Sequence, residues 1–239
     1  MQQYRLGVLG GMGPQATNTF YQFIIDRTDA RTDQEHINAL ILSDSGMPDR
    51  TAAILGSEGA RTAVYQRLLA DAKLLEGAGC TCIAVPCNTS HFFLDRVQEH
   101  IGIPILHMIR ETAKALVAQG KTRPGILATD GTIRTGLYQK EFAAMGIEAV
   151  IPSPEAQKLV MSLIYDDVKA GRDGDPQKFA AIHKDLMAQG CDCGVLACTE
   201  LSVFAAAHHL PPFYTDAMAV LAERSVEACR RPLRDIFIK

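Results

Sequence analysis

Residues 79–90 read GCTCIAVPCNTS, and residues 190–201 read GCDCGVLACTEL. Each stretch is a short apolar run of strand length that ends on a cysteine, Cys87 or Cys198, and then turns polar. The two copies lie about half a chain apart in a protein of 239 residues. A repeat at that period predicts two similar domains, each presenting one cysteine at the end of a strand.

The overall composition is that of a globular protein without a strongly charged partner. An apolar fraction of 47% and a charged fraction of 21% are ordinary, and the net charge of −3 offers no basic face for nucleic acid. No run approaches the roughly 18 apolar residues of a membrane span, and the N-terminus lacks a signal-peptide pattern. We therefore expect a cytoplasmic protein with no nucleic-acid or membrane partner, whose seven cysteines are thiols.

Strand-like and helix-like stretches alternate along the chain, with glycines at the turns. Strands are predicted at residues 5–10, 37–42, 80–85 and 103–106, and then in the same order at 125–127, 147–151, 191–197 and 212–214. Helices are predicted at residues 14–29 and 62–75, after Cys87, and at 154–170, 176–189 and 216–230. Such alternation is typical of parallel sheets with helices on both faces.

The repeat therefore predicts an α/β fold of two similar three-layer domains related by an approximate two-fold axis. Each domain should contain a mainly parallel sheet of about four strands. The first domain would comprise residues 1–106 plus 215–239, because the last helix can return to pack on it, and the second would comprise residues 107–214. The active site is expected in the cleft between the domains.

The repeated cysteines are the candidate chemical groups. Ligands of open α/β sheets bind beyond the carboxyl ends of the strands, where Cys87 and Cys198 each precede a predicted helix. An ordinary thiol, with a pKa of roughly 8.5, is only about 3% thiolate at pH 7. A helix N-terminus can raise that share to a few tens of per cent, which is adequate for a general base.

Two cysteines that face each other across a pseudo-two-fold axis suggest inversion of a stereocentre. One thiolate would remove a proton from one face of a substrate carbon, and the opposed thiol would deliver a proton to the other face. Polar residues beside each cysteine, together with backbone N–H groups at the helix starts, could hold a carboxylate; they are Asn88, Thr89, Ser90 and Thr199.

Other interpretations compete for the remaining residues. The cysteines at the strand starts, Cys80, Cys82, Cys191 and Cys193, behave most simply as small buried hydrophobic residues, since C-x-C is not the usual zinc spacing. Cys229 has no counterpart and is expected to be structural.

Glu200 would support its own helix through the helix dipole and would oppose thiolate formation at Cys198. The G-x-G-x-x-A match at residues 11–16 would suit a dinucleotide-binding oxidoreductase, but that reading leaves the paired cysteines unexplained.

Taken together, the motifs at residues 85–91, 198–200 and 10–14 resemble the aspartate/glutamate racemase family, most closely its cofactor-independent aspartate racemases. Residues 48–51, 129–133, 165 and 168–171 extend the resemblance over essentially the whole chain. It implies two α/β domains with the active site in their cleft, no pyridoxal phosphate, no other cofactor and no metal. It also implies two cysteines as catalytic acid and base, and usually a homodimer.

Residue by residue, the resemblance places catalysis on Cys87 and Cys198. The implied substrate-binding residues are Met12, Arg50, Asn88, Thr89, Ser90, Thr129, Lys169, Thr199 and Glu200. Within this set, Arg50 and Lys169 would take the side-chain carboxylate, and Asn88, Thr89 and Thr199 the α-carboxylate or amino group. By analogy Cys87 would serve the D-enantiomer and Cys198 the L-enantiomer. Ala197 departs from the family pattern, in which glycine often precedes the second cysteine, and His91 could pack locally or relay a proton.

The expected activity is pyridoxal-phosphate-independent interconversion of L- and D-aspartate by a two-base mechanism. The nearest alternative is the same chemistry on glutamate or on a broader set of amino acids. A catalytically inactive binder of acidic amino acids is a further alternative. Both reacting cysteines are present, which favours turnover.

Overall fold

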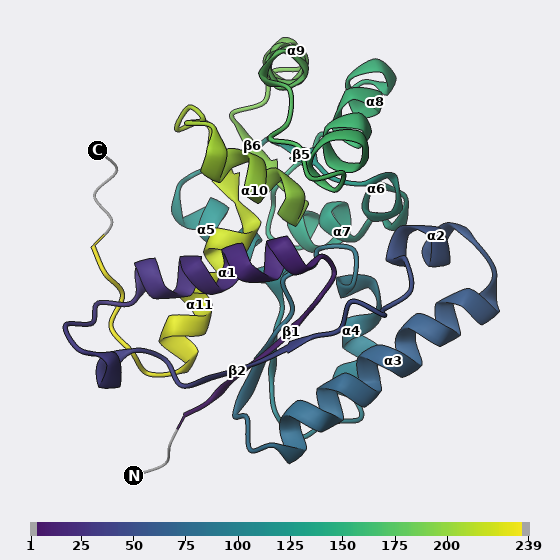
Figure 1. The fold of residues 1–239 in the computed structure, drawn as a ribbon. Coiled ribbons are helices and arrows are strands. Elements are labelled where there is room, and N and C mark those ends of the chain that lie inside the picture. Colours follow the sequence, from purple (N-terminus) through teal and green to yellow (C-terminus); the bar gives the residue numbers. More distant parts are fainter. Residues whose placement is uncertain (1–3, 236–239) are drawn as a thin grey trace.

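The protein contains two parallel sheets in a computed structural model that describes residues 4–235. Residues 1–3 and 236–239, the two ends of the first predicted domain, lie outside the described residues. The strand order is β2-β1-β3-β4 in the first sheet and β5-β6-β7 in the second. Figure 1 labels β1 and β2 of the first sheet and β5 and β6 of the second. The prediction of an α/β fold built on two parallel sheets is confirmed, whereas the domain boundaries stay a prediction.

The first sheet is built from four short apolar strands, and its two central strands are more deeply buried than its two edge strands. Its strands are β1 (Leu6–Gly10), β2 (Ala39–Ser43), β3 (Cys82–Ala84) and β4 (Ile105–Leu106). Leu6 of β1 aligns with Ala39 on one side and with Cys82 on the other. Every residue of β1 and β3 is buried, as expected for central strands covered on both faces.

The helices around this sheet begin where the sequence supplies a start signal. Pro14 opens α1 (Pro14–Arg27), and Ser57 caps α3 (Glu58–Gly77) by accepting from Ala60 N–H. The other elements of this part are the 3₁₀ turn η1 (Asp33–Glu35), α2 (Arg50–Leu55), α4 (His91–Gln98) and α5 (Met108–Ala118).

The second sheet has three strands, not the four expected from the repeat. They are β5 (Pro124–Leu127), β6 (Cys193–Leu196) and β7 (Tyr214–Asp216). The predicted strand at residues 147–151 is wrong, because it shrinks to a single parallel bridge between Val150 and Gly125. Prolines explain the loss: Pro124 and Pro152 have no N–H to donate, so the ladder cannot extend on either side of Val150.

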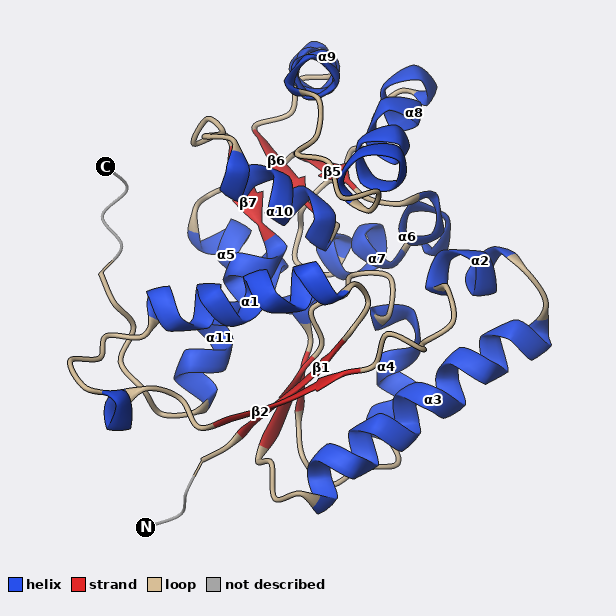
Figure 2. Ribbon diagram, in the orientation of Figure 1, coloured by secondary structure: helices blue, strands red, loops and turns tan. Residues whose placement is uncertain are grey.

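Helices cover the second sheet as they cover the first (Figure 2). They are α6 (Asp130–Thr135), α7 (Leu137–Ala143), α8 (Pro154–Ser162), the π-helical segment η2 (Leu163–Val168), α9 (Pro176–Ala188), α10 (Thr199–Ala207) and α11 (Ala217–Ala228). Among these described helices and those of the first sheet, none combines the length and the apolar character that a membrane crossing requires.

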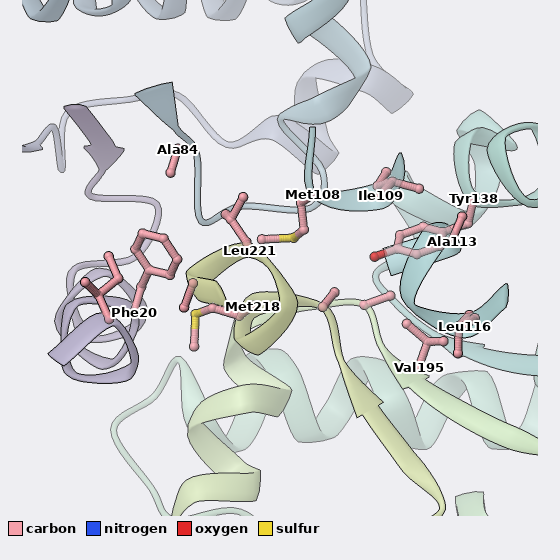
Figure 3. Close-up of a cluster of buried hydrophobic side chains, with 14 of the residues drawn as sticks. Phe20, Ala84, Met108, Ile109, Ala113, Leu116, Tyr138, Val195, Met218 and Leu221 are labelled. Carbon is pink, nitrogen blue, oxygen red and sulfur yellow. The ribbon is translucent and has the colours of Figure 1, made fainter. Parts of the chain in front are cut away.

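The largest buried cluster joins the two sheets. It contains Val8 of β1, Val195 of β6 and Leu221 of α11, and α11 packs on both α1 and α5. Figure 3 shows this cluster, with Phe20 facing Met218 and Leu221. Separate clusters fill the outer faces, one beneath α3 and α4 and the other beneath α8, α9 and α10. The shared core fixes the two sheets to each other and therefore fixes the relative position of their strand ends.

The carboxyl ends of four strands converge on one region. β1 leads to Met12, β3 to Cys87, β5 to Thr129 and β6 to Cys198. The turn after β1 requires Gly11, whose φ of +87° is left-handed and whose missing Cβ leaves room for the backbone of Asp44. Tight turns at these ends bring the side chains that follow them into a common space.

Candidate active site

A narrow chamber lies where these strand ends meet. Its volume is about 10 Å³. It adjoins a vestibule of about 600 Å³, and Met12, Arg50 and Lys169 line both spaces. The residues that line the chamber are Met12, Asp49, Arg50, Thr51, Cys87, Asn88, Thr89, Thr129, Tyr165, Lys169, Cys198, Thr199 and Glu200.

The chamber brings together all of the sequence-predicted site residues except Ser90. Both candidate cysteines are almost completely buried, with exposed fractions of 5% for Cys87 and 6% for Cys198. Ser90 is fully buried outside the chamber, and its hydroxyl donates to the sulfur of Met12 at 3.2 Å. It therefore supports the loop that carries its neighbours, and the structure does not place it toward a substrate.

Cys198 is the N-cap of α10 and is paired with a carboxylate. Its thiol donates to Oε2 of Glu200 at 2.8 Å, and Oε1 of Glu200 lies 3.8 Å from Nζ of Lys169. Burial, followed by the charge of Glu200, raises the pKa of Cys198 well above its ordinary value. The expectation that the helix N-terminus would increase the thiolate share is therefore wrong at Cys198, because burial and the carboxylate outweigh the dipole.

Cys87 is held differently, in a turn that separates it from the next helix. Three residues, Asn88 to Ser90, lie between Cys87 and the start of α4 at His91, so no helix begins directly at this cysteine. The carbonyl of Cys87 accepts a hydrogen bond from Nδ1 of His91 at 2.9 Å. Nε2 of His91 accepts from Met108 N–H at 3.0 Å, which assigns the ring proton to Nδ1. His91 thus fixes the backbone of the turn, and both ring nitrogens are occupied.

Arg50 presents a buried cation that its own helix does not favour. It is the first residue of α2, where the helix dipole opposes positive charge, and its exposed fraction is only 9%. The guanidinium donates to the carbonyls of Met12, Met47 and Pro48, while Nε is buried and has no partner among the described residues. A charge kept buried at such a cost, with one donor unpartnered among the described residues, makes Arg50 a candidate for binding an anion.

Hydroxyl groups from both halves meet at the chamber, where Thr51, Thr89 and Thr129 are lining residues. Thr89 contacts Thr129 at 3.3 Å and Thr132 at 2.9 Å, and Thr51 donates to Thr129 at 3.3 Å. Thr129 also caps α6 by accepting from Thr132 N–H. These hydroxyls join the turn after β3 to the turn after β5, and they supply polar atoms that can bind carboxylate or ammonium groups.

Sequence reasoning missed several residues that build the site. Thr51 and Tyr165 line the chamber, and Tyr138 donates to Oδ1 of Asn88 at 2.5 Å. Tyr165 lies in the π-helical segment, a feature that often marks functional sites but has no clear sequence signature. Thr51 and Tyr165 both had a usable signal, since both fall within the residues on which the family resemblance rests, whereas Tyr138 had none.

The remaining cysteines are buried in the hydrophobic clusters. Cys80, Cys82, Cys191 and Cys193 are buried free thiols that pack in the hydrophobic clusters, and Cys229 is also buried and free. One group of described side chains has the spacing of metal ligands: Asp95, His107 and Glu141. Arg110 donates to both carboxylates, so this group is a partly exposed ion-pair cluster with its own cation.

Two buried histidines beneath Cys87 should make the fold sensitive to acid. Burial, followed by the neighbouring His107, lowers the pKa of His91 to about 3, and burial, followed by Arg110, lowers that of His107 to about 4. The unfolded chain gains these protons below pH 6.5, whereas the folded chain does not, so stability is present above that pH and is lost as the pH falls. For each histidine, the free energy of unfolding should fall by about 2 kcal/mol as the pH falls from 7 to 5.

Urea unfolding of the wild type and of His107→Asn at both pH values measures this effect. Asparagine can still cap α5, and other titrating groups cancel in the comparison. We expect the variant to lose about 2 kcal/mol less than the wild type. An identical loss in the two proteins would show that His107 is protonated in the folded state.

Comparison with known proteins identifies the family of the chain. The family model described as Asp/Glu/Hydantoin racemase matches residues 9–224. The chain is 28% identical over 201 residues to the broad specificity amino-acid racemase RacX of Bacillus subtilis (strain 168), covering 82% of this chain and 86% of RacX. Shorter matches include the glutamate racemase of Picosynechococcus sp., 31% identical over 132 residues, covering 52% of this chain and 44% of that protein.

Solved structures agree over nearly the whole chain. The aspartate racemase of Picrophilus torridus superposes with a TM-score of 0.81 at 28% identity, covering 97% of this chain and 96% of that one. A putative Asp/Glu racemase from Yersinia pestis gives 0.79 at 25% identity, covering 95% of this chain and 100% of that one. The fold and the paired-cysteine chamber therefore define an amino-acid racemase. The chain belongs to the Asp/Glu/Hydantoin racemase family.

Proposed function

We propose that this protein interconverts L- and D-aspartate without pyridoxal phosphate, using Cys87 and Cys198 as opposed acid and base. The observation that carries the proposal is that the ends of two strands in different sheets deliver one cysteine each to a single buried chamber. Racemisation needs a proton removed from one face of the α-carbon and another delivered to the opposite face. Two thiols in one chamber supply both roles, and their roles exchange when the reaction runs in reverse.

Binding groups for both ends of aspartate border the chamber. The unpartnered Nε of Arg50 and the ammonium of Lys169 suit the side-chain carboxylate. Nδ2 of Asn88 is buried without a partner among the described residues, and the hydroxyls of Thr89 and Thr199 lie in the same wall. These donors suit the α-carboxylate, so the α-carbon would lie between the sulfurs.

Glu200 gives Cys198 a route to the thiolate. The Cys198 thiol already donates to Oε2 of Glu200, so transfer of this proton leaves a thiolate beside a neutral carboxylic acid. The ammonium of Lys169 near Glu200 can stabilise the negative charge shared by the pair. When Cys198 acts as the acid instead, its thiol already carries the proton to be delivered. We infer that Glu200 acts through Cys198 more than through the substrate.

A second candidate is racemisation of a broader set of amino acids. The vestibule of about 600 Å³ has room for side chains longer than that of aspartate. It carries both signs of charge, since Arg172 and Asp173 line it beside Lys169. RacX, a relative of this chain, is itself described as broad in specificity.

The proposal extends to the oligomeric state and the cellular location of the protein. We infer a homodimer without cofactor or metal, because this is what the family resemblance implies. A cytoplasmic location suits a protein whose cysteines are all free thiols in the structure. Sedimentation of the purified protein tests the homodimer.

A substrate panel tests the function. Purified enzyme, dialysed against chelator and given no pyridoxal phosphate, would be offered L-aspartate, L-glutamate, L-alanine and L-lysine, with chiral chromatography of the products. We expect aspartate to have the highest kcat/KM. Comparable values for lysine or alanine would replace the aspartate proposal with the broad one, and activity only after addition of pyridoxal phosphate would refute the cofactor-independent mechanism.

A further inference from the structure

Tyr138 meets the chamber only through Asn88. Asn88 lies in the turn after β3, and Tyr138 lies on α7, beside the second sheet. The Tyr138 hydroxyl is 2.5 Å from Oδ1 of Asn88, and Tyr138 does not itself line the chamber. The contact therefore joins a site residue in one half of the molecule to a buried residue in the other half.

The partners of the two ends of the amide show which way Asn88 faces. The phenolic O–H of Tyr138 donates to the carbonyl oxygen of the amide. Nδ2 is left on the other side, where it is buried without a partner among the described residues, and Asn88 is 3% exposed.

We propose that Tyr138 is a positioning residue that turns the NH₂ group of Asn88 into the chamber as the donor for the substrate's α-carboxylate. The inference rests on the proposed function, because it deepens the role given there to Asn88. A flipped amide would present Oδ1 instead and would repel a carboxylate. Tyr138 thus determines whether Asn88 attracts or opposes the substrate.

The surroundings of Tyr138 suit such a fixed role. Its side chain is 1% exposed, and its ring packs edge-on against Phe142 with 5.2 Å between centroids. Figure 3 shows it beside Ile109 and Ala113 of α5. Burial, followed by the nearby Asp216, raises the pKa of Tyr138 well above its ordinary value, so the hydroxyl keeps its proton.

A double-mutant cycle tests the proposal. We expect Tyr138→Phe to raise KM for both enantiomers of aspartate about tenfold, the size of effect typical of one misdirected hydrogen bond to a charged group. In an Asn88→Ala background, the same change should alter KM less than twofold, because the amide it orients is gone. Phe142→Leu is the matched packing control: it should lower Tm and leave KM unchanged. Equal effects of Tyr138→Phe in the two backgrounds would overturn the proposal.

A binding measurement separates this inference from the proposed function. Calorimetric titration of L-aspartate into Cys87→Ala, with and without Tyr138→Phe, measures the carboxylate contact without turnover. If the wild type fails to racemise aspartate but Tyr138→Phe weakens aspartate binding, the inference is supported and the proposed function is refuted. Racemisation by the wild type, with binding that does not depend on Tyr138, would refute the inference alone. Absence of aspartate binding to both proteins would refute both.

Discussion

Replacing either Cys87 or Cys198 by alanine should lower kcat/KM for aspartate by at least about 10³-fold. A positioned general acid or base typically contributes 10² to 10⁴-fold, and the residues that line the chamber include no third cysteine to take over the lost role. L- and D-aspartate have equal free energy, so the loss must be the same in both directions. Chiral chromatography at equal enzyme concentration measures it.

Cys80 and Cys191 provide matched controls for the two substitutions. They occupy the corresponding positions at the starts of the repeated stretches, and both are buried outside the chamber. Their alanine variants should lose some stability and keep kcat. Each inactive variant should still exchange the α-proton of one enantiomer with solvent through its remaining cysteine, and the two variants should act on opposite enantiomers. Racemisation that survives in Cys198→Ala would refute the two-base mechanism.

Arg50→Lys should reduce kcat/KM for aspartate by about 10²-fold, the second largest effect that we expect. The guanidinium bonds to three backbone carbonyls and still has a free Nε donor. Lysine has three donors on a flexible stem and cannot reproduce that fixed direction. A charge-assisted hydrogen bond contributes about 1.5 to 3 kcal/mol, which corresponds to roughly 10 to 150-fold.

Specificity for the side-chain carboxylate distinguishes binding by Arg50 from a structural effect. Arg61→Lys is the matched control, because Arg61 also donates to two carbonyls, those of Ile54 and Gly56, but lies outside the chamber. The Arg50 variant should lose kcat/KM for aspartate and change little on alanine, which has no side-chain carboxylate. Equal losses on both substrates would show that Arg50 supports the loop and does not select the substrate.

The sequence was most informative where local pattern and spacing carry the information. The duplicated stretch predicted β3 and β6 and the cysteines beyond them, because a buried central strand is a short apolar run bounded by turn signals. The strand expected at residues 147–151 failed because two prolines remove donors from both sides of a ladder. That effect depends on which segments become neighbours.

Features that depend on contacts across the fold were beyond sequence reasoning. Tyr138 lies far from Asn88 in sequence, and nothing around it marks it as part of the site. The sequence already indicated an asymmetry, because Glu200 follows Cys198 closely, but it did not show that Cys198 donates to this carboxylate or that Cys87 lies in a turn anchored by His91. The two cysteines are almost equally buried, so their different polar partners distinguish them, and those partners follow from the packing of both halves.

Racemisation of L-aspartate in D₂O, without added cofactor and followed by mass spectrometry and chiral separation, tests the two-base mechanism most directly. The thiol that delivers the proton exchanges with solvent, whereas the proton removed from the substrate goes to the other cysteine. At early times we therefore expect the D-aspartate formed to carry deuterium at the α-carbon, while the L-aspartate that remains is still largely unlabelled. D-aspartate that retains the original α-proton would contradict the mechanism, because a single group would then have moved that proton from one face to the other.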